Sequence, residues 1–465
     1  MRSPDGSLGN RDALVTRRHL GLGALASLVV QVAPLVAVTI LSVVVARRLG
    51  PSGTGTIALL LALFEVLVAL FGFGLTTGIT YLTSRGDWSV RNAFRESQAA
   101  AAVLGTIGIG LGLAFFAITH NSIFAGVSVL SAVLAVGHLP FSLGRAFTAA
   151  IALARERYEA YTAFELVGTS FLLAVAVPLT FFFGLNGALA GIAVARVAAF
   201  VASSVWAIRY ARVAQSPPQA QPGRLREAAA FGSKVWGATL LQLINYRLDL
   251  FLLGAFVSRA EVGRYSVALS VTALAWVLPA ALESVIFPRT ADLHAAEVRG
   301  EISAEHADAA TVRAVRHSVV LLVPATALVV VLVVGAVPLL YGSAFTQTVW
   351  YGLILIPGVI ALSLGKSVSA VIAGRGRPQY ALWTTAITVP LTIALYLGLI
   401  PVLGAYGAAL GSTISYFTST VLGLIWFKRT THLRLRLALV PSSAEWRDYV
   451  DALSNVRRRV RPRAV

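Results

Sequence analysis

Long apolar stretches follow one another along almost the whole chain, and they constrain its fold more than any other feature. Each is at least about 18 residues long, which is enough to cross a bilayer core of about 30 Å. We therefore expect an all-α polytopic membrane protein with twelve transmembrane helices. The predicted spans are 20–46, 55–83, 98–118, 122–144, 160–182, 184–208, 231–256, 264–288, 316–340, 347–372, 380–402 and 404–427.

Composition agrees with a membrane protein. Hydrophobic residues make up 57% of the chain, charged residues only 12%, and the mean hydropathy is +0.78. A soluble domain with so few charges could not keep its surface hydrated. The chain has no cysteine, which excludes disulfides and thiolate metal sites. The first apolar stretch is too long for a cleavable signal, and Arg47-Arg48 follows it instead of a small-residue cleavage site.

Parts of the sequence occur twice. The matches are collinear at a near-constant offset, so they indicate a two-fold repeat and two pseudo-symmetric six-helix bundles. In membrane transporters such bundles move against each other around a central substrate site. The matching segments are 184–191 with 404–411 and 155–157 with 375–377, both at an offset of 220, and the segments that begin at Gly55 and Gly263, at an offset of 208.

The repeat and the composition together predict five regions. A linker rich in proline and glutamine, Ser216–Gly223, reads as an extended tether between the bundles. The last residues are rich in arginine, and we expect them to lie on anionic lipid headgroups. The regions are an N-terminal tail 1–19, a first bundle 20–208, a cytoplasmic linker 209–230, a second bundle 231–427 and a basic tail 428–465.

The net charge of +18 reports membrane topology. With the N-terminus in the cytoplasm and twelve alternating spans, 32 of the 38 lysines and arginines fall on the cytoplasmic side and 4 in outer loops. This positive-inside bias predicts a multi-pass protein of the cytoplasmic membrane with both termini in the cytoplasm. Membrane lipids are therefore the expected partners of the basic residues, and no nucleic-acid partner is expected.

Four charged residues lie deep in predicted spans. At 1.5 Å per residue, Glu65 is about 15 Å and Arg196 about 18 Å into the bilayer, and Arg247 and Asp249 are about 20 to 23 Å from the start of their helix. Each buried charge costs several kcal/mol unless it is paired or hydrated. These residues therefore either line a hydrated cavity or form internal ion pairs between helices.

One predicted helix, 231–256, carries a polar stripe. Thr239, Gln242, Asn245, Tyr246 and Asp249 recur at three- and four-residue steps, which places them on one face. A face of this kind requires water or a polar ligand. Arg247 lies about 200° round the helix from Asp249, so the two side chains cannot both point straight into one cavity.

Two further acidic residues lie close to the cytoplasmic ends of their spans. Glu165 is near the start of the fifth predicted helix, and Glu283 is near the end of the eighth. At that depth they are expected at the membrane interface or at a cavity mouth.

The candidate enzymatic motifs in the sequence do not have the residue spacing that their chemistry requires. Gly365-Lys366-Ser367 resembles the end of a phosphate-binding loop, but the preceding glycine, Gly358, is seven residues back, where the motif needs five. The histidines show no metal-ligand spacing, and no Gly-x-Ser-x-Gly elbow occurs. We expect no catalytic residues, no metal site and no cofactor, and hence a protein that is not an enzyme.

Several motifs resemble a known family. Arg47–Gly55 looks like the R-x-L-G-P-x-G-x-G element of the polysaccharide-biosynthesis flippases, a branch of the multidrug/oligosaccharidyl-lipid/polysaccharide (MOP) exporter superfamily. Residues 247–254 and 261–266 resemble the helix-seven element D-x-x-L-L-G … V-G-x-Y-S of that family. The segments at Gly184 and Gly404 resemble its sixth and twelfth helices. The resemblance covers residues 20–427 and implies a MATE-like fold.

The resemblance implies a flippase that moves undecaprenyl-pyrophosphate-linked oligosaccharide to the outer leaflet by alternating access, for surface polysaccharide synthesis. A pyrophosphate and a sugar need buried cations and polar faces. We expect Arg196 and Arg247 to bind the headgroup, and Glu65 and Asp249 to couple an ion or to balance the arginines. Gln242, Asn245 and Tyr246 are expected beside them in the central cavity. Polysaccharide-assembly proteins are further candidate partners.

Two alternatives remain open from the sequence. A cation-coupled multidrug antiporter of the same superfamily would favour acidic residues in its cavity, and Arg196 argues against it. A membrane-embedded glycosyltransferase or ligase would need a long extracytoplasmic loop for its catalytic residues, and the predicted outer loops are very short.

Overall fold

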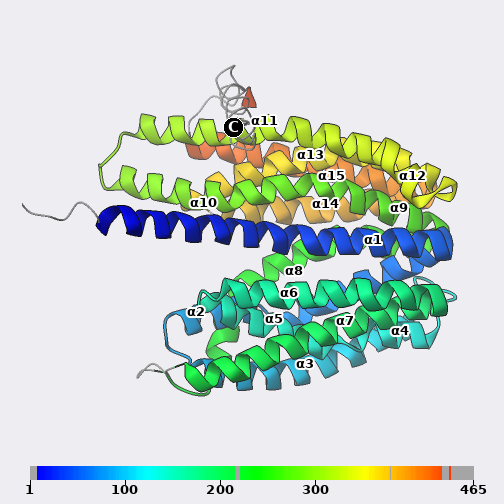
Figure 1. The fold of residues 1–465 in the computed structure, drawn as a ribbon. Helices are drawn as coiled ribbons and strands as arrows, with labels where there is room; N and C mark the ends of the chain where they lie inside the picture. Colours follow the sequence, from blue (N-terminus) through cyan, green and yellow to red (C-terminus); the bar gives the residue numbers. More distant parts are fainter. Residues whose placement is uncertain (1–7, 215–219, 378, 432–438, 441–465) are drawn as a thin grey trace, which may run out of the picture. The chain divides into compact units, whose positions relative to one another are not determined.

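The computed structural model describes residues 8–214, 220–377, 379–431 and 439–440, and this part of the chain consists of helices and short connections without a β-strand (Figure 1). The predicted all-α membrane class is confirmed, since eight helical segments among the described residues are long and apolar enough to cross a membrane. The chain forms two compact units, Met1–Arg247 (unit 1) and Leu248–Val465 (unit 2).

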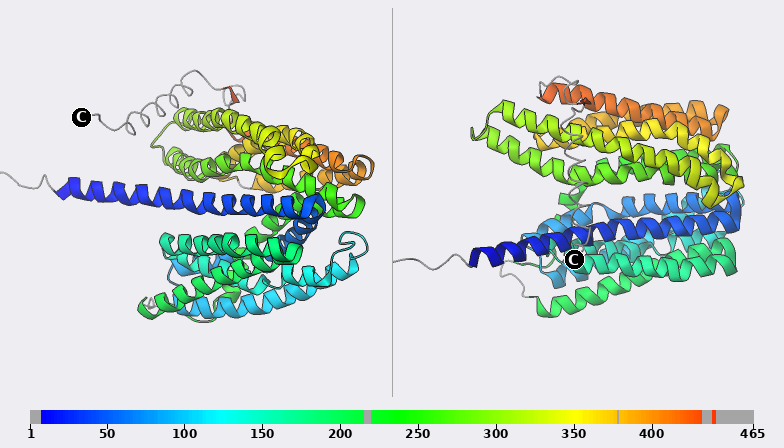
Figure 2. Two further views of the ribbon diagram at one scale, coloured as in Figure 1. Left: turned by 45° about the vertical axis from the view of Figure 1, so that its right-hand side comes forward. Right: turned by 45° about the horizontal axis from the view of Figure 1, so that its top comes forward.

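Unit 1 consists of antiparallel helices that lie side by side (Figures 1 and 2). Helix α3 packs on α5, α5 also packs on α2 and α7, and α6 packs on α7. A π-helical turn, η1 (Leu172–Ala176), joins α6 to α7. The helices are α1 (Leu8–Gly72), α2 (Leu75–Ser84), α3 (Val90–Ile118), α4 (Val129–Val136), α5 (Leu139–Ala154), α6 (Tyr158–Phe171), α7 (Val177–Val213) and the part of α8 (Leu225–Phe256) that precedes the unit boundary.

Unit 2 is organised around α13, which packs against α15, α10, α9 and α11. Its core at one end of α13 contains Val368, Val371 and Ile372, packed with Val315 of α11 and Phe427 of α15. The helices are α9 (Arg259–Thr272), η2 (Ala273–Trp276), α10 (Val277–Val298), α11 (Ala304–Val331), η3 (Leu332–Ala336), α12 (Val337–Tyr341), η4 (Ser343–Phe345), α13 (Thr346–Gly374), α14 (Gln379–Leu403) and α15 (Ala405–Thr431).

Glycines with positive φ divide two of the eight apolar segments. Helix α1 leaves helical geometry at Gly50 (φ 67°, ψ −173°), and α7 leaves it at Gly184 (φ 58°, ψ −131°). Both breaks fall where the sequence predicts an outer loop between two spans. Gly404, the repeat partner of Gly184, has the same φ of 58°. The breaks raise the number of passes above eight, and the count of twelve stays a prediction.

The repeated glycines let consecutive helices pack closely within each unit. A Cβ atom on Gly187 would lie 1.9 Å from the carbonyl oxygen of Leu179, and one on Gly407 would lie 2.3 Å from that of Leu399. Both distances are far below van der Waals contact. The neighbours, like the glycines, are 220 residues apart, so the repeat predicted from sequence corresponds to the same close helix contact in both units.

The connection between the predicted bundles is shorter than the sequence suggests. Helix α7 continues to Val213 and α8 begins at Leu225, while residues 215–219 lie outside the described part. The amide of Gly223 donates to Oε1 of Glu96 at 2.9 Å, which attaches the end of the connection to α3. The first part of α8 belongs to unit 1, and the five regions predicted from the sequence stay a prediction.

Most of the two predicted tails lies beyond the described residues. In the N-terminal tail, residues 1–7 are outside and α1 begins at Leu8. In the basic tail, residues 432–438 and 441–465 are outside, and α15 ends at Thr431. The predicted contact of the basic tail with lipid headgroups stays a prediction.

The turns that follow α5 and α13 repeat one backbone geometry. Glu156 has φ 56° and Gly376 has φ 75°, so both residues are left-handed. The amide of Glu156 donates to the carbonyl of Leu153, and that of Gly376 to the carbonyl of Ala373, both at 3.0 Å. A residue with a side chain is strained in the left-handed region. Gly376 therefore adopts this turn with less backbone strain than Glu156.

Exchanging these residues should change stability in opposite directions. Glu156→Gly removes left-handed strain at the cost of some chain entropy, and we expect a net gain of about 0.5–1 kcal/mol. Gly376→Glu should lose a similar amount. The apparent melting temperature of the detergent-solubilised protein measures both effects. A lower melting temperature for Glu156→Gly would show that the Glu156 side chain stabilises the turn more than its backbone strains it.

Candidate functional site

Arg247 forms an ion pair in unit 1. Its Nε donates to Oε2 of Glu65 on α1 at 2.6 Å, and both side chains are part-exposed. Nearby, Nε1 of Trp236 donates to the carbonyl of Ala69 at 2.7 Å, which also attaches α8 to α1. The two deep charges that the sequence singles out on separate helices therefore lie together, and each compensates the other.

Asp249 is held in unit 2 by a hydroxyl network and is only 1% exposed. The Tyr265 hydroxyl donates to its Oδ2 at 2.8 Å, and the amide of Leu250 donates to its Oδ1 at 2.7 Å. The Tyr265 hydroxyl also lies 3.3 Å from the Ser412 hydroxyl, which lies 2.8 Å from that of Tyr396. This network connects α8, α9, α14 and α15 around one carboxylate, and the prediction that Arg247 and Asp249 point to different surroundings agrees with it.

Removing the tyrosine hydroxyl should destabilise this network. Tyr265 is fully buried, so Tyr265→Phe deletes a donor to a desolvated carboxylate at a cost of about 1–3 kcal/mol. Tyr406→Phe, on the exposed part of α15, is the matched control and should have little effect. The apparent melting temperatures of both variants measure the difference. Equal melting temperatures would mean that the hydroxyl does not stabilise Asp249.

Arg196 is a deep cation of unit 1 without an ion-pair partner among the described residues. It lies twelve residues past the break at Gly184, about 18 Å along α7. Its side chain reaches open space, and among the described residues it makes no ion pair or hydrogen bond. Its charge interacts at longer range with those of Arg145, Glu165 and Glu65. Arg196 therefore faces the charged interior of unit 1 with a free guanidinium.

A cavity of about 660 Å³ lies in unit 1, and the charge of Arg196 interacts with two of its lining residues, Arg145 and Glu165. Arg145 of α5 and Glu165 of α6 form an ion pair in its wall, with both side chains about one fifth exposed. Tyr161 of α6 and Phe231 of α8 also line it. Helix α2 contributes a set of hydroxyl-bearing residues, namely Thr76, Thr77, Thr80, Tyr81 and Ser84. Glu165, expected from the sequence at a cavity mouth, lines this cavity.

A further ion pair lies next to the cavity, in contact with its lining residue Tyr81. Nη1 of Arg85 donates to the Tyr81 hydroxyl at 2.7 Å, and Arg85 also pairs with Asp87 at 3.1 Å. The hydrogen bond with Tyr81, followed by the attraction of Asp87, raises the pKa of the Arg85 guanidinium. Arg85 therefore stays charged at every physiological pH, and Asp87 balances its charge.

Hydropathy does not reveal this cavity, because the fourth apolar span ends at 144 and leaves Arg145 in a predicted cytoplasmic loop. In the structure, α5 continues to Ala154, so Arg145 lies on a helix of unit 1. The α2 hydroxyls were available as a signal, because Thr76, Thr80 and Ser84 recur every four residues on one helix face.

The remaining predicted site residues lie on α8 and α10. Nε2 of Gln242 donates to the Tyr246 hydroxyl at 3.1 Å on the exposed side of α8. Oδ1 of Asn245 is buried and has no hydrogen-bond partner among the described residues. The Glu283 side chain lies outside the described part of the structure, although its backbone belongs to α10. The polar stripe therefore offers one free buried acceptor.

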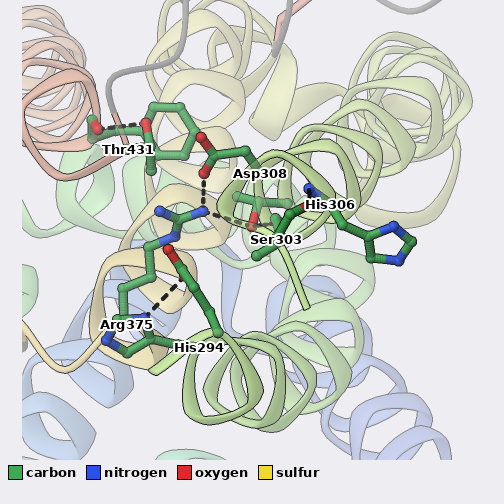
Figure 3. A network of polar contacts seen from close by, with 10 residues as sticks. His294, Ser303, His306, Asp308, Arg375 and Thr431 are labelled. Carbon is green, nitrogen blue, oxygen red and sulfur yellow. Dashed lines mark hydrogen bonds and ion pairs between the residues drawn. The ribbon is translucent and has the colours of Figure 1, made fainter. Parts of the chain in front are cut away.

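A polar cluster stabilises one end of unit 2 (Figure 3). Arg375, at the end of α13, forms an ion pair with Asp308 of α11 and lies 3.4 Å from the Thr311 hydroxyl. Ser303 caps α11 by accepting from the amide of His306 at 3.2 Å. Because these polar groups form ion pairs and hydrogen bonds with one another, the cluster stabilises the end of α13 and the start of α11. Among the described residues, no group of three or more acidic or histidine side chains could hold a metal ion.

The fold matches solved membrane transporters. A structure of the lipid II flippase MurJ in an inward closed conformation aligns with a TM-score of 0.66 and 13% identity, over 90% of this chain and 89% of that one. An inward-facing multidrug resistance MATE family transporter of the MOP superfamily aligns with a TM-score of 0.59 and 18% identity, over 87% and 98%. At such identities the likeness shows the fold alone. The protein is thus a polytopic helical membrane protein with the MOP fold.

Sequence comparison then defines the family. Residues 44–350 match the family described as polysaccharide biosynthesis protein, which is more than half of the chain, and the chain belongs to that family. A probable low-salt glycan biosynthesis flippase of Haloferax volcanii, Agl15, is 27% identical over 175 residues. That match covers 38% of this chain and 36% of Agl15, so the chain spans only about a third of this curated relative.

Proposed function

We propose that this protein is a flippase that moves an undecaprenyl-pyrophosphate-linked oligosaccharide across the cytoplasmic membrane for surface polysaccharide assembly. Membership of the polysaccharide biosynthesis family, the MOP fold and the flippase relatives support this function. One observation carries it, namely the free guanidinium of Arg196 within a membrane-spanning helix. Transport would proceed by alternating access of the two units, and polysaccharide-assembly proteins would take up the product.

The energetics of Arg196 favour an anionic ligand. A charged side chain near the centre of a membrane helix costs about 2.5–3.5 kcal/mol or more unless it finds a partner. Arg247 has Glu65, and Arg145 has Glu165. Arg196 has no such partner among the described residues, so a ligand anion can supply the missing charge. The planar guanidinium suits a pyrophosphate, because its fork of donors matches two phosphate oxygens at once.

The other predicted residues take supporting roles in this proposal. Arg247 would contribute to headgroup binding, with Glu65 balancing its charge when the site is empty. Gln242, Asn245 and Tyr246 would supply hydrogen bonds from α8. Asp249 would stabilise unit 2 and, if it exchanges its proton, couple transport to an ion gradient. The multidrug alternative predicts a free acidic residue where Arg196 stands, and the observed free cation therefore favours the flippase.

Arg196 provides the direct test. Arg196→Ala should weaken binding of undecaprenyl pyrophosphate about 10- to 100-fold, because it removes one charge-assisted contact, and should abolish surface polysaccharide. Arg196→Lys should retain part of both. Arg91→Ala, an exposed arginine in the first turn of α3, is the matched control. Binding is measured on protein in nanodiscs and export by surface staining. Normal export by a stably expressed Arg196→Ala variant would contradict the proposed role.

Topology is tested separately. If both termini are cytoplasmic, alkaline phosphatase fused after Phe427 should be inactive, because this enzyme needs an oxidising compartment to form its disulfides. A fusion after Leu403, at the predicted outer end of α14, should be active. Western blots of the fusions control for their amounts. The opposite pattern of activity would overturn the twelve-span topology.

A further inference from the structure

The cavity of unit 1 has polar groups that the protein itself leaves unused. The hydroxyls of Thr76, Thr77 and Tyr161 make no hydrogen bond among the described residues, yet they lie at the cavity surface. The Thr80 hydroxyl donates to the carbonyl of Thr76 at 2.9 Å, which leaves its oxygen lone pairs free to accept. The cavity thus presents several hydroxyl donors and acceptors to whatever fills it.

The same cavity carries no uncompensated charge of its own. Arg145 and Glu165 neutralise each other in its wall. The free cation, Arg196, is not among the lining residues but is close enough for its charge to interact with both of them. An anionic ligand group is therefore expected at Arg196, and an uncharged, hydroxyl-rich group is expected in the neighbouring cavity.

Part of the lining is apolar. Ala146, Ala149 and Leu153 contribute apolar side chains from α5. At the edge, the rings of Tyr81 and Phe231 stack with centroids 4.0 Å apart. Sugar rings combine hydroxyl edges with apolar faces, so walls of both kinds suit them. The volume of about 660 Å³ lies within the range of about 300–1,000 Å³ that is typical of small-molecule pockets.

From this arrangement we infer that the unit 1 cavity is a saccharide subsite, which binds the uncharged sugar attached to the lipid pyrophosphate while Arg196 binds the pyrophosphate. This inference rests on the proposed flippase function. It assigns the sugar-recognising residues to α2 and α6, namely the hydroxyls of Thr77, Thr80 and Tyr161.

The test separates sugar recognition from headgroup recognition. The probes are undecaprenyl pyrophosphate without sugar and the same lipid carrying one glucose, galactose or N-acetylglucosamine, and dissociation constants are measured on full-length protein in nanodiscs. The wild type should bind at least one sugar-bearing lipid about tenfold more tightly than the bare lipid. Thr77→Val combined with Thr80→Val should remove about three- to tenfold of that gain, since it deletes two hydrogen-bonding hydroxyls. Affinity for the bare lipid should not change.

Two further variants keep the test independent of folding. Ala146→Phe fills the cavity and should remove the sugar-dependent gain, whereas Ala102→Phe, on the exposed face of α3, should not. Thr106→Val is the hydroxyl control, because Thr106 is exposed on α3 and bonds only to its own helix at 2.8 Å. Melting temperatures verify that each variant is folded.

The possible outcomes are distinct. Equal affinity of the wild type for the bare lipid and for all three sugar-bearing lipids would overturn the saccharide subsite but leave the flippase proposal intact. A sugar-dependent gain that survives both the double valine variant and Ala146→Phe would place sugar binding elsewhere and would also overturn it. Failure to bind any of the four lipids would contradict the proposed function itself.

Discussion

The cost of placing polar groups among apolar helices is the constraint on which the rest of this structure depends. Hydrocarbon offers no hydrogen-bond partners, so the backbone must satisfy itself within helices and each deep charge must find an opposite charge, a hydroxyl or water. The described residues follow this rule closely. Arg247 pairs with Glu65, Arg145 pairs with Glu165, and Asp249 is bound by a tyrosine hydroxyl and a backbone amide.

Arg196 is an exception to this rule, and we relate it to the proposed function. Arg196 is equally deep and permanently charged, but it has no ion-pair partner among the residues that the structure describes. A protein can retain such a residue when a ligand supplies the missing anion. The adjacent cavity complements it, because its own charges cancel and its hydroxyls are free. In the proposed function, unit 1 would bind an anionic group at Arg196 and an uncharged sugar in the hydroxyl-rich cavity.

Helix α8 belongs to two environments. Up to Arg247 it packs in unit 1 through the Glu65 ion pair and the Trp236 hydrogen bond. Two residues later, Asp249 is bound within unit 2. Because successive helical residues are 100° apart, two side chains on one short stretch can serve different bundles.

The sequence by itself determines the class of this protein, because hydropathy and positive-inside bias depend on composition along the chain and need no knowledge of packing. It also determines the repeat, since Gly187 and Gly407 must both be small for helices to approach. The sequence does not determine which charged residues contact one another. Glu65 and Arg247 are 182 residues apart, and no local pattern pairs them. Arg145 also lies just beyond the end of an apolar stretch, so hydropathy does not place it in the bundle. Only the continuation of α5 brings it into contact with Glu165. Ion pairs and cavities depend on how distant helices pack, and the tertiary structure alone decided that Arg247 is compensated while Arg196 is free.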